Sequence, residues 1–450
     1  MSLPPSVFVE SGPPLVERAL APFRRFARTA SGGGLVLLAC TAIALAWANS
    51  PWASSYHHLW ESEVALAIGG WSVRSTLHHL INDGLMAVFF FLVGLEIKRE
   101  VLAGELASLS SAALPLAAAA GGMIVPAALY AAVNVGREGM SGWGVPMATD
   151  IAFALGVLAL LGDRIPGALR VFLAALAIVD DIGAVLVIAI FYSGGVAPEP
   201  ILAALVLLAI AAGANVIGVR SPLVYGLIGI VLWGAVLASG VHATIAGVLL
   251  AMTIPARTRI DEKAFLTGAR RTLEDFDAAH EPDGNPLTNH AHQSAIHELQ
   301  ELSDHAQTPL NRLEHGLHGI VAFAIIPLFA LANAGVSLGG DAAAALTSSV
   351  TIGVLLGLVV GKPLGVTLAA WAIVRLGLAR LPAGVSWRAI HGAAWLAGIG
   401  FTMSIFIAGL AFPGSPELLT AAKLGILGAS AIAGIGGWLL LRGVGRPASP

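Results

Sequence analysis

Cysteine and charge are both scarce in this sequence of 450 residues. Cys40 is the only cysteine, which excludes an intrachain disulfide and a cysteine-based metal cluster. Charged residues make up 11% of the chain, against roughly 25% in an ordinary soluble domain, and this excludes a typical soluble enzyme. The formal net charge is -3 and no basic stripe runs along the chain, so the electrostatic footprint of a nucleic-acid-binding protein is missing.

Hydrophobic residues, in contrast, make up 57% of the chain. Apolar runs of about 20 residues have the length that crosses the core of a bilayer. Twelve such runs lie at 32–49, 77–96, 112–133, 146–162, 168–191, 201–219, 223–238, 241–254, 315–336, 350–376, 390–412 and 420–441. The sequence therefore predicts an all-α polytopic membrane protein with twelve transmembrane helices.

The distribution of Lys and Arg predicts the orientation of these helices, because basic residues concentrate on the cytoplasmic side. With the N-terminus inside, only Arg74, Arg137 and Lys423 fall outside, and Lys362 lies within a span. The predicted organisation is a cytoplasmic segment 1–31, helices 1 to 8 in 32–254, a long cytoplasmic loop 255–314, helices 9 to 12 in 315–441 and a cytoplasmic tail 442–450.

Two of the predicted loops have distinct patterns. Residues 64–73 flank Gly69-Gly70, which is a two-residue hairpin signal, so a β-hairpin outside the membrane is one interpretation and an irregular loop is the other. The loop 255–314 is rich in acidic residues and holds five histidines between His280 and His305, whose spacing matches no specific metal site. Its composition predicts a solvated, irregular segment.

Four charged residues lie inside predicted spans: Asp150, Asp180, Asp181 and Lys362. Each costs about 2.5 to 3.5 kcal/mol at the middle of a bilayer, so a functional role is favoured over chance. The structural alternative is an ion pair that clamps two helices. One Lys with one Asp can serve that purpose, but it leaves two carboxylates unexplained.

Two unpaired carboxylates in a low-dielectric site require a mobile cation. They cannot both be ionised at low cost when they lie close together, so we expect at least one of them to bind a proton reversibly. A dehydrated alkali cation prefers hard oxygen ligands, and carboxylates, the Thr149 hydroxyl and freed backbone carbonyls supply them. Competition between a cation and protons for one site, combined with alternating exposure, is the minimum requirement of an antiporter.

Freed backbone carbonyls are expected where spans are interrupted. Gly142, Gly144 and Pro146 precede Thr149-Asp150 and predict a break in the fourth span. Gly398-Ile399-Gly400 predicts a second break in the eleventh span. The interrupted spans are central in two candidate halves, spans 3 to 5 and spans 10 to 12. Pro363 also biases the backbone of the preceding residue away from regular helix, which predicts a local bend there.

Six motifs follow one another through the membrane portion: INDGLMAVFFFLVGLEIKR (81–99), ATDIAFALG (148–156), AIVDDIG (177–183), SGVHAT (239–244), GKPLG (361–365) and GIGFTMSIF (398–406). In this order they resemble the NhaA family of bacterial Na+/H+ antiporters. The resemblance implies twelve helices with inverted repeats (helices 3 to 5 and 10 to 12), of which helices 4 and 11 are broken. It also implies pH-activated export of Na+ or Li+ in exchange for protons at the inner membrane, serving pH and sodium homeostasis. Because two free carboxylates can accept two protons for one monovalent cation, we expect the exchange to be electrogenic.

The resemblance assigns roles residue by residue. Asp181 resembles the family's principal ion and proton carrier. Asp180, beside it, either pairs with Lys362 or joins the proton exchange. These two aspartates are therefore the expected ligands of transported Na+. Asp150 and Thr149 match the residues of the broken helix that line the site. Lys362 is either a proton carrier or a structural partner. Activation by pH is expected to involve Glu96, Glu100, Glu314, His315 and His318.

Simpler interpretations stay open for several of these residues. Glu96 and Glu100 lie beside basic residues and are equally well explained as a solvated helix end. His242 matches a position of the family but is more simply a packing residue, and Asp83, at the other end of its span, is interpreted as structural. The resemblance also implies a homodimer formed through the 64–73 hairpin, and no cofactor is expected.

Two other classes of protein compete with an antiporter. A passive cation channel would use the same polar groups without moving protons uphill. An intramembrane aspartyl protease also places aspartates on two helices, but it needs YD and GxGD motifs, whereas this chain has Thr149-Asp150 and Asp180-Asp181.

Overall fold

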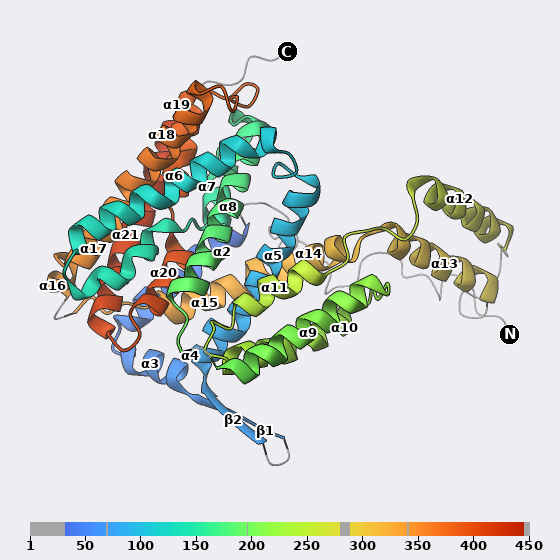
Figure 1. Ribbon diagram of the computed structural model, residues 1–450, viewed down its shortest axis with the longest axis horizontal. Coiled ribbons are helices and arrows are strands. Elements are labelled where there is room, and N and C mark those ends of the chain that lie inside the picture. The colour runs from blue at the N-terminus through green and yellow to red at the C-terminus, as the bar shows by residue number, and fades with distance from the viewer. Residues whose placement is uncertain (1–31, 69–70, 196, 280–288, 340–341, 445–450) are drawn as a thin grey trace.

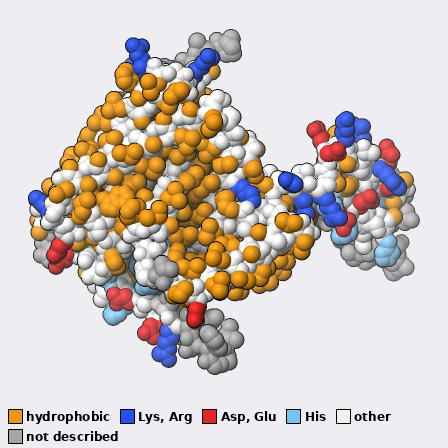
Figure 2. Space-filling model, viewed as in Figure 1, with side chains coloured by type: hydrophobic (Ala, Val, Ile, Leu, Met, Phe, Trp, Pro, Cys, Tyr) orange, Lys and Arg blue, Asp and Glu red, His pale blue; other side chains and the backbone are white. Residues whose placement is uncertain are grey.

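A computed structural model describes residues 32–68, 71–195, 197–279, 289–339 and 342–444. Within these ranges, seven helices are long and apolar enough to cross a membrane, and up to ten spans are obtained if each of three bent helix pairs counts as one. The class of all-α polytopic membrane protein is thus confirmed. Figure 2 shows hydrophobic side chains over most of the visible face of the helical body, with most of the charged side chains at its edges.

The elements of the N-terminal half are α2 (Gly32–Ala48), α3 (Ala53–Glu61), β1 (Glu63–Ile68), β2 (Trp71–Thr76), α4 (Leu77–His79), η2 (Leu80–Leu85), α5 (Met86–Ala103), α6 (Leu109–Asn134), η3 (Glu138–Met147), α7 (Ile151–Ala159), η4 (Gly162–Arg164), α8 (Gly167–Phe191), α9 (Pro198–Val216) and α10 (Pro222–Ala238). Within the helical body, the long helix α6 packs against α8 and α18 (Lys362–Arg375), whereas α9 and α10 lie on the opposite side of the body (Figure 1).

The remaining elements complete the helical body and add a projecting helix pair. They are α11 (Ile245–Thr253), α12 (Glu262–Ala278), α13 (His290–Ala306), α14 (Pro309–Ile320), η5 (Val321–Ile325), α15 (Ile326–Asn333), α16 (Ala342–Leu346), α17 (Ser349–Leu355), η6 (Leu356–Gly361), α18 (Lys362–Arg375), α19 (Trp387–Ala397), α20 (Phe401–Ala411) and α21 (Pro416–Arg442). Helices of the body begin and end within a few residues of most predicted apolar runs, because run length and flanking polar residues are local properties.

Two interrupted helix pairs lie where the sequence predicts them. The axis bends by 43° between η3 and α7 and by 45° between α19 and α20. The first break falls after Pro146, and the second falls at Gly398–Gly400. Both breaks leave backbone groups outside regular helical hydrogen bonding, and these groups are available to one another and to ions.

The long helices α6 and α18 cross beside these breaks, and glycine permits their close approach. A Cβ atom at Gly121 would overlap the carbonyl oxygen of Gly365, and a Cβ atom at Gly365 would overlap the carbonyl oxygen of Gly121. Small residues at such a crossing bring two helix backbones together. The crossing sets the position of Lys362, whose side-chain carbons lie beside Gly122.

The expected bend at Lys362 takes a different form. Lys362 has regular right-handed helical angles, φ -64° and ψ -53°, so the prediction of a non-helical backbone there is wrong. The irregularity lies one turn earlier, in the π-helical segment η6. The wider π turn accommodates Pro363, which has no backbone N–H, without breaking the helix.

The segment 64–73 contains an antiparallel pair of strands. Glu63 of β1 pairs with Thr76 of β2, and the register runs through to Ile68 opposite Trp71. The turn residues 69–70 lie outside the described part of the chain. The hairpin extends away from the helical body (Figure 1).

The prediction of an irregular segment at 255–314 is wrong for α12 and α13. These helices pack side by side and project from the body (Figure 1). The side chains of Asp261 and Asn289 cap their N-termini, and Phe276 stacks on His292 with ring centroids 4.2 Å apart. The polar composition was interpreted as irregular structure, but it is compatible with two amphipathic helices. Glu, Lys, Arg, Ala and Leu are good helix formers whether or not they are buried. Of the five histidines, His280 lies outside the described residues.

Candidate functional site

Asp150 joins the two helix breaks. It is the N-cap of α7, where Oδ1 accepts a hydrogen bond from the Phe153 backbone N–H at 2.9 Å. Its Oδ2 accepts hydrogen bonds from the backbone N–H of Thr402 at 3.1 Å and from the Thr402 hydroxyl. Its own N–H donates to the Ile399 carbonyl at 2.7 Å. One carboxylate therefore offsets the positive ends of two half-helices, α7 and α20.

Asp180, on α8, is held by a lysine and a threonine. Lys362 Nζ lies 2.6 Å from Asp180 Oδ2 and also donates to the Met147 carbonyl oxygen. Thr149 Oγ1 lies 2.6 Å from the same Asp180 oxygen and 2.8 Å from the Ala397 carbonyl oxygen. Both side chains of the ion pair have no exposed surface. A buried charge pair of this kind is tolerated because additional hydrogen bonds satisfy it.

Asp181 is the carboxylate that the protein leaves unpaired. It is 1% exposed, and its side chain makes no hydrogen bond or ion pair with any described residue. Its nearest charges are those of Asp180, Glu96, Asp150 and Lys362. Oδ1 of Asp180 is likewise buried without a partner. Buried carboxylate oxygens are rarely left without a donor or a cation, so these two unpartnered oxygens make the two aspartates the candidate site for a proton or a metal cation.

The η3 half of the first broken helix is held by two tyrosines that the sequence did not single out. The hydroxyl of Tyr130, on α6, donates to the Gly139 carbonyl at 2.7 Å. Tyr192, which follows α8, donates to the Ser141 carbonyl at 2.8 Å and accepts the Gly144 N–H at 3.2 Å. The ten residues of η3 form an unusually long 3-10 helix, and such helices rarely exceed four residues. These side-chain contacts stabilise it and position the carbonyl of Met147 next to Lys362.

Thr402, which follows the second predicted break, was not predicted as a site residue. A threonine four residues after Gly398 in an otherwise apolar run was the available signal. The carbonyls of Met147, Ala397 and Ile399 carry no signal in the sequence, because any residue supplies a carbonyl. Only the meeting of the two breaks reveals them.

The acidic residues expected to respond to pH meet at the far end of α5. Arg99 forms an ion pair with Glu314, whose side chain is 8% exposed, and lies 3.1 Å from Glu100 Oε1. Oε2 of Glu100 accepts the Glu105 backbone N–H, and Oε2 of Glu314 is buried without a partner. Glu96 lies within range of the charges of Glu314, Arg99 and Glu100. The structure therefore brings these three glutamates together around Arg99, which the sequence analysis did not select.

The two histidines of the predicted pH-responsive set lie apart from this cluster. His315 and His318 are both exposed, and His315 Nδ1 contacts the Asn311 carbonyl oxygen at 2.9 Å. They share the helix α14 with Glu314, which is buried: His315, one position further along, lies on a different face, and His318, four positions further along, lies one turn away on the same side.

Buried carboxylates, a buried lysine and two crossed helix breaks within an apolar helical body define a class of protein. They are the features of a secondary ion transporter, in which ions bind at the middle of the membrane between discontinuous helices. The sequence profile described as Na+/H+ antiporter 1 matches residues 24–441, and the chain belongs to this family.

Individual relatives agree with this assignment. A protein of Oleidesulfovibrio alaskensis named Na(+)/H(+) antiporter NhaA is 51% identical over 440 residues, covering 98% of this chain and 98% of that protein. Proteins of the same name from Koribacter versatilis and Acidithiobacillus ferrooxidans are 53% identical over 426 residues and 52% identical over 430 residues. They cover 95% of this chain, with 92% and 98% of their own lengths. These relatives are named as transporters, and neither a channel nor a protease is supported.

Proposed function

We propose that the protein is a Na+/H+ antiporter that binds either Na+ (or Li+) or protons at Asp181 and Asp180. The observation that carries this proposal is the contrast between the two neighbouring carboxylates. One oxygen of Asp180 is held by Lys362 and Thr149, whereas Asp181 makes no hydrogen bond with a described residue. Asp181 is therefore the principal carrier, and Asp180 contributes its free Oδ1. Thr149 and Asp150 position the surrounding backbone.

The stoichiometry follows from the charges at the site. Three aspartates face one lysine, and Asp150 is already stabilised by two helix N-termini. The other two carboxylates, Asp180 and Asp181, then exchange one monovalent cation for more than one proton. Lys362 either holds Asp180 or carries one of those protons. A cycle that moves more protons than sodium ions is electrogenic.

The proposed topology has twelve spans with inverted repeats. The spans are α2, α5 with η2, α6, η3 with α7, α8, α9, α10, α11, α14 with α15, α17 with α18, α19 with α20, and α21. Each of the two repeats, spans 3 to 5 and spans 10 to 12, has its broken helix in the middle. Both termini and the α12–α13 pair lie in the cytoplasm, because basic residues concentrate on that side of the bacterial inner membrane.

Regulation by pH is assigned to the cluster of Glu96, Glu100 and Glu314 around Arg99. These carboxylates lie at the cytoplasmic end of α5, and the charge of Glu96 reaches Asp181. Proton loss from the cluster alters its contacts with Arg99 and thereby the access of ions to the central site. His315 and His318 are exposed residues of the same helix, α14, and contribute to the same response.

Antiport predicts a specific response in everted membrane vesicles. After respiration has acidified the vesicle interior, addition of Na+ or Li+ is expected to release protons, which a pH-sensitive dye reports as recovery of fluorescence across a pH series. The rate is expected to depend on membrane potential, set with K+ and valinomycin, because net charge moves in each cycle. Na+ flux without any proton movement would identify a passive channel instead. Exchange that ignores the potential would exclude the unequal stoichiometry.

A homodimer is proposed through the β1–β2 hairpin, which extends from the helical body and presents unpaired strand edges. Deletion of residues 64–73 is expected to convert the dimer into a monomer in detergent, measured by light scattering, while the helical content is retained. A matched control, Arg137→Gln, removes an exposed basic side chain outside the hairpin and is expected to leave the dimer unchanged. A dimer that persists after the deletion would place the contact elsewhere.

A further inference from the structure

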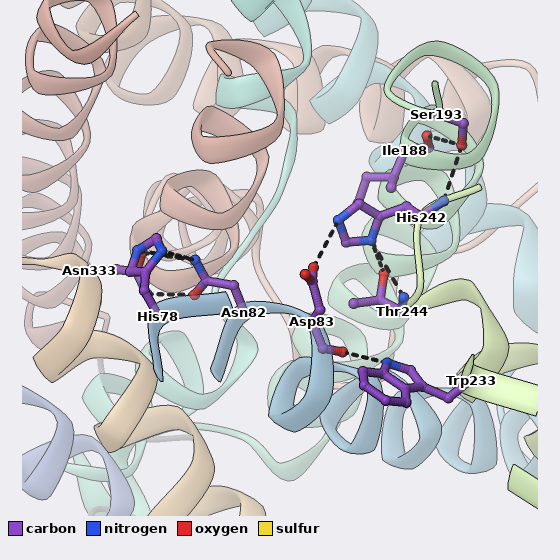
Figure 3. A network of polar contacts seen from close by, with 9 residues as sticks. All are labelled: His78, Asn82, Asp83, Ile188, Ser193, Trp233, His242, Thr244 and Asn333. Atoms are coloured by element: carbon purple, nitrogen blue, oxygen red, sulfur yellow. Dashed lines mark hydrogen bonds and ion pairs between the residues drawn. The ribbon is translucent and has the colours of Figure 1, made fainter. Parts of the chain in front are cut away.

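Histidine side chains form hydrogen bonds between neighbouring helices in this protein. On α4, His78 Nε2 lies 3.1 Å from Oδ1 of Asn333, on α15 (Figure 3). His391, on α19, makes a comparable contact with α18, where its Nδ1 lies 3.0 Å from the hydroxyl of Thr367. Because α18 begins with Lys362 and α19 ends at the second helix break, the contact of His391 joins two helices that build the central site.

A second hydrogen bond fixes the ring proton of His391. The indole N–H of Trp395, one turn further along α19, donates to His391 Nε2 at 3.1 Å. An indole N–H is a donor only, so Nε2 carries no proton. The proton of the neutral ring then lies on Nδ1, which donates to the Thr367 hydroxyl. Both ring nitrogens are satisfied in one orientation of the side chain, and this orientation ties α19 to α18.

The indole ring of Trp395 in turn packs against α21. A Cβ atom at Gly436 would lie 2.5 Å from Cε3 and 2.6 Å from Cζ3 of Trp395, so the ring occupies the space that a larger residue at position 436 would fill. His391 and Trp395 together therefore contact the helices on both sides of α19. The η3 half of the other broken helix is held in a similar way, by Tyr130 and Tyr192.

The position of α19 relative to α18 matters because each helix supports Asp180. Lys362, at the start of α18, lies 2.6 Å from Asp180 Oδ2. The carbonyl oxygen of Ala397, at the end of α19, lies 2.8 Å from the Thr149 hydroxyl. Thr149 in turn lies 2.6 Å from the same Asp180 oxygen. A shift of α19 along α18 would separate these two supports.

The contact between His391 and Thr367 lies close to both supports. Thr367 follows Lys362 by five positions, which corresponds to about 8 Å along α18. His391 precedes Ala397 by six positions, or about 9 Å along α19. A hydrogen bond at this distance from both ends limits the sliding of one helix along the other and keeps the supports of Asp180 in register.

We propose that His391 is a positioning residue, which holds α19 against α18 and thereby sets the affinity of the central site for Na+. The proposal rests on the proposed antiport function and adds to it a residue that acts through Thr149 and Lys362 without touching the ion. Loss of the contact loosens the Asp180 carboxylate, whose free Oδ1 is one of the proposed Na+ ligands. Na+ binding is then weakened, whereas the proton-carrying groups themselves are unchanged.

The test separates Na+ affinity from the maximal rate of exchange in everted vesicles. For His391→Phe we expect the half-saturating Na+ concentration to rise roughly three- to tenfold, as for the loss of one interhelical hydrogen bond, and the maximal rate to change by less than about twofold. Thr367→Val removes only the hydroxyl and is expected to shift the affinity in the same direction. His391→Gln supplies an acceptor for Trp395 and a donor for Thr367, and is expected to recover most of the affinity.

The matched control is His58→Phe, which makes the same change at an exposed histidine of α3 and is expected to leave both values unchanged. Unchanged Na+ affinity in both His391→Phe and Thr367→Val would overturn the proposal. A lower maximal rate at unchanged affinity, or no recovery in His391→Gln, would also overturn it, because His391 would then act by packing alone. Failure of the unmodified protein to exchange Na+ for protons would instead overturn the proposed function.

Discussion

Asp181→Asn is expected to reduce Na+/H+ exchange to below about 1% of the unmodified rate while the protein remains folded. The amide is nearly isosteric with the carboxylate, but it carries no charge to bind Na+ and takes up no proton. Because the Asp181 side chain makes no hydrogen bond with a described residue, its replacement takes no partner away from another described residue. Proton release on addition of Na+ in everted vesicles, at equal expression, measures the loss.

The neighbouring aspartate provides the matched control. Asp180→Asn is the same chemical change one residue away, but it removes the partner of Lys362 and leaves a buried ammonium uncompensated. We expect this variant to unfold at a clearly lower temperature, whereas Asp181→Asn keeps the thermal stability of the unmodified protein. Exchange retained in Asp181→Asn would refute its assignment as principal carrier.

Lys362→Met is expected to destabilise the protein by about 3 to 5 kcal/mol, which is the usual cost of removing one partner of a buried ion pair. The substitution leaves the Asp180 carboxylate without a cation at a position with no exposed surface, and it also removes the donor to the Met147 carbonyl. Thermal unfolding in detergent, followed by tryptophan fluorescence, measures the effect. The loss is expected to shrink as the pH falls, because a protonated Asp180 is neutral and no longer needs a cation.

A double variant separates the ion pair from simple packing. Lys362→Met combined with Asp180→Asn removes both charges, and replacing both members of a buried pair costs little. We therefore expect the double variant to regain most of the stability lost in Lys362→Met. If the double variant were as unstable as the single one, the lysine would contribute through its packing against α6 rather than through its charge.

Several elements were predictable from the sequence because the relevant signal is local. A run of apolar residues crosses a bilayer wherever it lies in the chain, and Gly398-Ile399-Gly400 weakens a helix without help from its neighbours. The four charged residues within spans were recognisable for the same reason, since their cost in the membrane depends on depth and not on sequence context.

Other predictions failed where a pattern allowed two structures. The charged segment 255–314 lacks apolar runs, so it was taken as irregular, although its apolar residues recur at helical spacing over 262–278 and 290–306. The Lys362-Pro363 pair was expected to bend the backbone, but the π turn of η6 absorbs the proline. Both errors arose because the residue types of a segment indicate whether it lies in water or in the membrane more directly than they indicate its backbone conformation.

The sequence by itself determined the class of membrane protein, the positions of the helices and breaks, and the charged residues that the membrane makes costly. Only the tertiary structure decided which aspartate Lys362 holds, because that contact joins residues 182 positions apart across two helices. It also decided that Asp150 caps both half-helices. The physical reason is that burial cost is set residue by residue, whereas hydrogen-bond and charge partners depend on which helices cross and at which turn.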